Sequence, residues 1–146
     1  MTVAINMQKN HHASQLSPVG WYIASYIERI DPVEVYEQDS KDHHPWIIRK
    51  NRILVKAFTP EEAWERTIEH LADFGYDYTN PDGVHLRTTV VGLTSLVPIY
   101  DALEDGCEIE WIDRTGETIM DIRDRILEKS ELEAFTVPSP SSESFD

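Results

Sequence analysis

Histidines are the first residues in this sequence that could do chemistry. His11-His12 and His43-His44, the second pair beside Asp42, supply ligand atoms that zinc accepts. Adjacent side chains point apart in an extended chain, however, and there is no HExxH or CxxC spacing to hold a tetrahedral ion. We therefore expect solvated loop histidines and assign no residue to a metal site.

Nucleophilic and acid–base chemistry also lack a recognisable pattern. The single cysteine, Cys107, would need a thiolate-stabilising neighbour, but Asp105 and Glu108 are acidic instead. Glu108 and Glu110 would share one face of a strand about 7 Å apart, a separation used by glycosidases. Half-exposed strands commonly carry such pairs for solubility. Because GxSxG, SxxK and the phosphate-binding glycine motifs are also missing, we assign no catalytic and no cofactor-binding residue.

Net charge limits the classes of partner. The chain has 146 residues, with 13 basic and 27 acidic side chains and a formal charge of −14. This charge repels phosphate backbones and anionic lipids, so we expect neither nucleic-acid nor membrane binding. One cysteine fits a reducing compartment, and we see no signal-peptide pattern and no apolar run that could span a bilayer. We expect a cytoplasmic protein.

Acidic residues gather on one predicted helix, whereas basic residues gather just before it. Residues 46–58 carry four basic and no acidic residues, and Glu61, Glu65, Glu69 and Asp73 then follow at intervals of four. Such spacing places the four carboxylates along one side of a helix. They form either a solvated surface or the contact site for a basic protein partner, and they are our candidate partner-binding face.

The helix that carries these carboxylates has a clear beginning and end. Thr59 can cap it, Pro60 suits the first turn, Glu62 completes a capping box, and Gly75 follows its end near residue 74. At 100° per residue, one arc of the helix is largely apolar and consists of Ala63, Trp64, Thr67, Ile68, Leu71 and Phe74. We expect this arc to lie on a sheet, and replacing Trp64 by alanine to destabilise the fold by ~3–5 kcal/mol.

Strand patterns occur before and after this helix. Residues 21–30 are apolar on both faces, as in an interior strand, and residues 46–58 are β-rich, either as one strand or as a hairpin turning at 49–51. Residues 86–100 form a further strand, with a bulge suggested at Gly92 and an edge or end at Pro98. We also predict short strands at 33–36 and 107–112, and a second amphipathic helix over 116–134.

These elements predict an α+β fold. Short links between strands favour a mainly antiparallel sheet with two amphipathic helices packed on one face, and a ferredoxin-like variant is one way to connect them. Residues 1–20 are polar and aperiodic and are interpreted as a flexible lead-in. Residues 21–135 form a single α+β domain, and the serine- and proline-rich residues 136–146 a disordered tail.

Three segments resemble one known family. They are Trp21 to Ser25, the strand-to-helix junction from Ile53 to Trp64, and the turn from Leu103 to Glu108. Together they resemble the uncharacterised family catalogued as domain of unknown function 4288, over roughly residues 21–112. The resemblance implies a compact α+β domain and provides no site residues. The sequence departs from the family pattern in a longer loop at 31–45 and an extra helix after residue 115.

Two function hypotheses follow. The first is a non-enzymatic cytoplasmic interaction or accessory module, either inhibitory or immunity-like, that binds a basic protein. It is based on the strong acidity and on the lack of a catalytic pattern. The alternative is a small-molecule-binding protein or small enzyme with a pocket between sheet and helices, based on 14 aromatic residues that could line one. A homo-oligomer is compatible with both.

Overall fold

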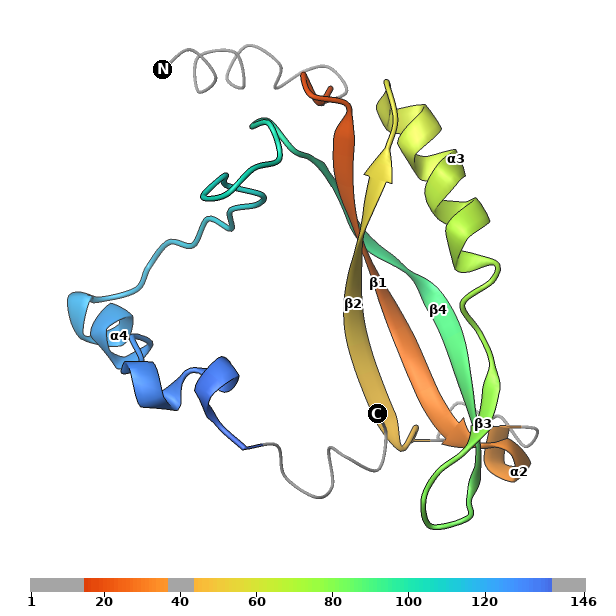
Figure 1. The fold of residues 1–146 in the computed structure, drawn as a ribbon. Coiled ribbons are helices and arrows are strands. Elements are labelled where there is room, and N and C mark those ends of the chain that lie inside the picture. Colours follow the sequence, from red (N-terminus) through yellow and green to blue (C-terminus); the bar gives the residue numbers. More distant parts are fainter. Residues whose placement is uncertain (1–14, 37–43, 138–146) are drawn as a thin grey trace.

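A four-stranded antiparallel sheet forms the body of the protein (Figure 1). The computed structural model describes residues 15–36 and 44–137. Its elements in chain order are β1 (Trp21–Pro32), α2 (Val33–Tyr36), β2 (Ile47–Lys56), α3 (Pro60–Leu71), β3 (Asp77–Thr79), β4 (His85–Pro98), α4 (Ile119–Asp124) and two 3-10 turns, η1 (Lys129–Glu131) and η2 (Glu133–Phe135). The predicted α+β class with an antiparallel sheet is confirmed.

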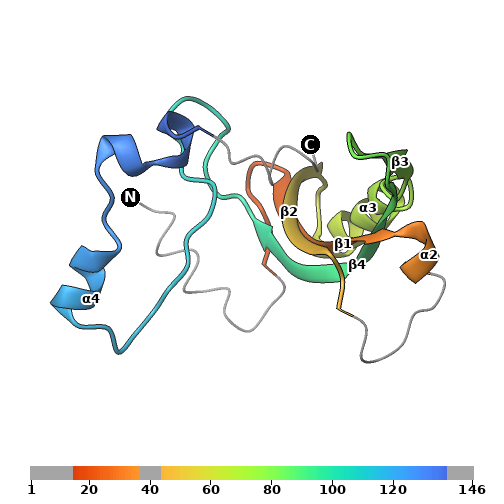
Figure 2. The ribbon, with the colours of Figure 1, turned by 90° about the horizontal axis from the view of Figure 1, so that it is seen from below.

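The strands lie in the order β2-β1-β4-β3, so β1 is an interior strand, as its two apolar faces predict. Tyr22 to Tyr26 are all buried, and β1 pairs with β2 on one side and β4 on the other. The register against β4 shifts near Gly92, where a bulge was predicted, and β4 ends at Pro98. These irregularities accompany the curl of the sheet (Figure 2).

Helix α3 covers one face of the sheet, which curls around it (Figure 2). The Thr59 hydroxyl accepts a hydrogen bond from the Glu62 N–H at 3.1 Å, which confirms the predicted cap. Ala63 is fully buried and packs with Tyr22 and Ala57. Small side chains at this contact let the helix lie close to the strands.

Three predicted elements differ in the structure. Residues 33–36 form the short helix α2 rather than a strand. Of the two forms left open for residues 46–58, the structure shows the single strand β2. Residues 107–112 have no strand pairing, because the chain leaves the sheet after Pro98. The second helix, predicted over 116–134, is reduced to the six residues of α4, which bury no side chain. A helix that short needs tertiary packing to persist.

Connectivity and termini complete the fold. The element order β1-α2-β2-α3-β3-β4 does not reproduce the β-α-β-β-α-β order of a ferredoxin-like domain. Within the predicted lead-in, Ser17 is buried and its hydroxyl donates to the Ile99 carbonyl at 2.5 Å. Thr136 and Val137 are the described part of the predicted tail, and residues 138–146 lie outside the described residues.

Candidate interaction surfaces

The predicted partner-binding carboxylates all reach solvent. Glu61, Glu65 and Glu69 are exposed on α3, and Asp73 is exposed two residues beyond the last residue of the helix. Glu62 has a different role, which is to cap the start of α3: its carboxylate accepts a hydrogen bond from the Phe58 N–H at 3.1 Å. The structure therefore places three of the four carboxylates on one regular helix and the fourth in the turn that follows it.

Two large apolar side chains lie among these carboxylates. Trp64 is 49% exposed and Ile68 is 44% exposed, whereas Ala63, Thr67 and Leu71 are the buried residues of α3. The predicted apolar arc was thus too wide, because the small residues rather than the indole face Tyr22 and the sheet. On a helix, residues three and four apart are neighbours. The α3 surface, defined here as Glu61, Trp64, Glu65, Ile68 and Glu69, is consequently both aromatic and acidic.

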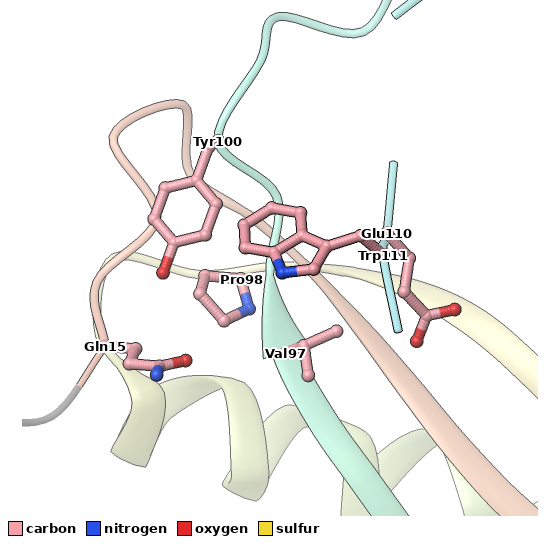
Figure 3. A pocket seen from close by; sticks show the side chains of 6 residues that line it. All are labelled: Gln15, Val97, Pro98, Tyr100, Glu110 and Trp111. Carbon is pink, nitrogen blue, oxygen red and sulfur yellow. The ribbon is translucent and has the colours of Figure 1, made fainter. Parts of the chain in front are cut away.

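A second candidate is a hollow beside the end of β4 (Figure 3). Its volume is about 200 Å³, and its lining consists of Gln15, Val97, Pro98, Tyr100, Glu110 and Trp111. The rings of Tyr100 and Trp111 lie 5.7 Å apart at 32°, over Pro98. Burial raises the pKa of the Tyr100 phenol, and the nearby Tyr22 adds to this effect. The hollow offers apolar walls and no paired acid and base.

The third candidate is a second hollow, which lies where the end of β2 meets the start of α3. Its volume is about 370 Å³, and Lys56, Phe58, Glu62 and Arg66 are among its lining residues. The Glu62 carboxylate is already engaged in capping the helix. The other polar side chains are Lys56, Arg66 and Ser17, and the Ser17 hydroxyl already donates to the Ile99 carbonyl. The two cations can attract an anion but offer no nucleophile.

Among the residues considered for metal and acid–base chemistry, the described part of the chain includes His44, Glu108 and Glu110. His11, His12 and His43 lie outside the described residues, and His44 is exposed. Within residues 15–36 and 44–137 no group of three or more metal-ligating side chains gathers. Glu110 lies 3.4 Å from the Arg52 guanidinium, while Glu108 is exposed. These two carboxylates therefore serve in different surroundings.

The sequence patterns did not predict the ion pairs near the C-terminal end of β1. Asp31 is fully buried and accepts a hydrogen bond from Arg29 at 2.6 Å, and it lies opposite Arg87 of β4 in the strand register. Arg87 also donates two hydrogen bonds to Asp77, at 2.8 and 3.0 Å, and these lower the pKa of that carboxyl. Alternation along β1 gives no signal for this buried charge, although Arg29 and Asp31 are two residues apart on the strand and therefore share a face.

Comparison with known families finds a match over the sheet-forming part of the chain. The model of the family described as "Domain of unknown function (DUF4288)" matches residues 21–111. The chain belongs to this family. The predicted resemblance is confirmed, and no curated protein and no solved structure matches the chain.

The DUF4288 match covers the whole sheet and α3, and it ends at Trp111, one of the residues lining the hollow beside β4. Helix α4 and both 3-10 turns lie beyond it. Among the described residues, none of the helices combines the length and the apolar character that crossing a membrane requires.

Proposed function

We propose that this protein is a non-enzymatic cytoplasmic interaction or accessory module, immunity-like in its action, that binds a basic protein partner through the α3 surface. The single observation that carries the proposal is the half-exposure of Trp64 and Ile68 among Glu61, Glu65 and Glu69. A partner would cover the two apolar side chains and meet the carboxylates with its own cations.

Interface energetics support this arrangement. Contacts between proteins are dominated by a few aromatic or arginine side chains that become desolvated at the centre of the interface. Trp64 could lie at the centre of such an interface, because Glu61 and Glu65 lie within one helical turn of it and can form the polar rim. The like charges of Glu61, Glu65 and Glu69 repel one another in the free protein, and a basic surface relieves that repulsion. Charge of this kind speeds encounter and is screened by salt.

A second candidate function rests on the 370 Å³ hollow between β2 and α3. This is the position that the small-molecule alternative requires, and its size is at the lower end of the ~300–1,000 Å³ typical of ligand sites. Lys56 and Arg66 would favour an anionic ligand. The hollow lacks convergent catalytic groups, so binding is favoured over catalysis as its use.

Affinity capture from the native host tests the main proposal. The wild-type chain and the double variant Glu65→Lys/Glu69→Lys are each used as bait, at low and at high ionic strength, and the captured proteins are quantified by mass spectrometry. We expect a basic protein that binds wild type at low salt and is lost both from the variant and at high salt. Both substituted side chains are exposed, so the fold should be unchanged.

A matched control carries the same change in charge elsewhere. Glu34→Lys/Asp82→Lys also replaces two exposed carboxylates with lysine, on α2 and in the turn before β4. It should capture the same partner as wild type. Equal capture by Glu65→Lys/Glu69→Lys would remove the α3 surface from consideration and leave a solvated helix face.

A further inference from the structure

The C-terminal segment, defined as residues 107–135, exposes far more apolar surface than a free segment should. None of the described residues from 100 to 137 is buried. Large side chains that are between 43% and 74% exposed include Ile112, Ile119, Met120, Ile122, Ile126 and Phe135. Exposed apolar side chains that gather in one part of a soluble protein mark interaction sites. The segment is therefore expected to be covered in the working protein.

Local interactions nevertheless give the C-terminal segment a defined shape. Thr118 and Asp121 form a reciprocal capping box at the start of α4, and Arg125 bonds to Glu117 at 2.5 Å. Six helical residues are well below the ~12–15 at which an isolated helix becomes even marginal. A sequence that specifies helix ends but leaves the helix without packing suggests that its packing partner is another molecule.

The face of the sheet opposite α3 offers a surface of matching character. Val55 lies on the α3 side, so alternation along β2 places Ile48, Lys50, Arg52 and Leu54 on the opposite side, and these four exposed β2 side chains are here called the uncovered face. Ile48 is 65% and Leu54 51% exposed. Two cations thus lie between two exposed apolar side chains on one strand.

The C-terminal segment and strand β2 carry opposite net charges. The C-terminal segment holds nine acidic and four basic residues, whereas β2 holds four basic and no acidic residues. The contact already begins within one chain, because Glu110 lies 3.4 Å from Arg52 and Trp111 packs near Tyr100. Strand pairing ends with β4 at Pro98, and α4 lies away from every strand in both views (Figures 1 and 2).

We infer that the protein forms a two-fold dimer in which each copy lays its C-terminal segment, beyond Ile112, over the uncovered face of the other copy. Every molecule carries both surfaces, so a reciprocal exchange covers both of them at once in both copies, as closed two-fold symmetry requires. The acidic segment meets the basic strand, and the apolar side chains of α4 meet Ile48 and Leu54. This dimer is independent of the α3 surface, which stays free for a different partner.

Sedimentation equilibrium of the full chain, over a wide concentration range, tests the dimer. We expect a monomer–dimer equilibrium that weakens as salt rises. Two variants should each become monomeric: Lys50→Glu/Arg52→Glu, which makes the uncovered face acidic, and Asp113→Lys/Asp124→Lys, which makes the segment basic. Each should raise the dimer dissociation constant at least about tenfold, since several contacts change from attraction to repulsion.

Mixing the two variants gives the decisive result. In the mixed pair an acidic face meets a basic segment and a basic face meets an acidic segment, so both contacts are restored. Dimer formation in the mixture, but in neither variant alone, supports the exchange. The control Glu34→Lys/Asp82→Lys should dimerise like wild type.

Three outcomes would overturn the inference. They are a wild type that stays monomeric at all concentrations, which would indicate closure of the segment on its own chain or a different partner; a dimer that both variants retain; and a mixture that fails to associate. Circular dichroism of each variant establishes that the sheet is intact, since all four substituted side chains are exposed.

Discussion

Ser17 joins the segment before β1 to the end of β4, and its replacement by alanine should destabilise the fold. The Ser17 hydroxyl donates to the Ile99 carbonyl at 2.5 Å and accepts from the Val19 and Trp21 N–H groups at 3.3 and 3.1 Å. Ser17 and Ile99 are both buried. Alanine leaves the Ile99 carbonyl without this donor, and an unsatisfied buried group costs about 1–3 kcal/mol.

The magnitude can be worked from these contacts. The Val19 and Trp21 N–H groups are only partly buried and can turn to water, so we take the middle of that range, about 2 kcal/mol. For a domain of this size, that loss lowers the melting temperature by roughly 6–12 °C.

Thermal and urea unfolding of Ser17→Ala measure the effect, with Ser130→Ala as the matched control. Ser130 is exposed in η1, so its replacement should change stability by less than about 0.5 kcal/mol. If Ser17→Ala unfolds at the wild-type temperature, residues 15–20 are not held to the sheet and the flexible lead-in predicted from sequence would extend to β1.

Three further perturbations have expected outcomes. Trp64→Ala should destabilise by only about 1 kcal/mol in urea unfolding, because half of the side chain is already exposed; a loss of 3 kcal/mol or more would show the indole to be buried. Thr59→Ala removes the hydrogen bond to the Glu62 N–H and should destabilise by about 1 kcal/mol, whereas an unchanged urea midpoint would mean that the cap contributes nothing. Burial raises the pKa of Tyr26, Tyr78 and Tyr100 above 10.0, so the unfolded chain loses its phenol protons first and stability should fall as pH rises above about 10; stability that stays constant there would contradict this assignment.

The parts of the fold that could be predicted are those with strong local patterns. β1 is apolar on both faces, and the Thr59-Pro60 pair defines the start of α3, so both elements were found close to their true bounds. Gly92 marked the bulge, because a glycine within a strand suggests a break in pairing.

Other features depend on contacts that sequence patterns do not contain. The exposure of Trp64 follows from the close approach of Ala63 to Tyr22, which only the packing of helix on sheet defines. The C-terminal segment has helical spacing from Ile119 to Leu127, yet a long helix requires a surface to pack on. Of the candidate site, the carboxylates were visible from spacing, whereas the apolar pair between them was assigned to the core.

Position-specific photo-crosslinking tests the role of the α3 surface most directly. A photoreactive amino acid replaces Trp64 in one sample and Asp82, an exposed residue of the turn before β4, in another, and both are irradiated in the native host. We predict a covalent adduct with a basic protein from position 64, lost when Glu65→Lys/Glu69→Lys is added, and none from position 82. No adduct at position 64, or the same adduct from both positions, would contradict the proposal that α3 is the partner-binding surface.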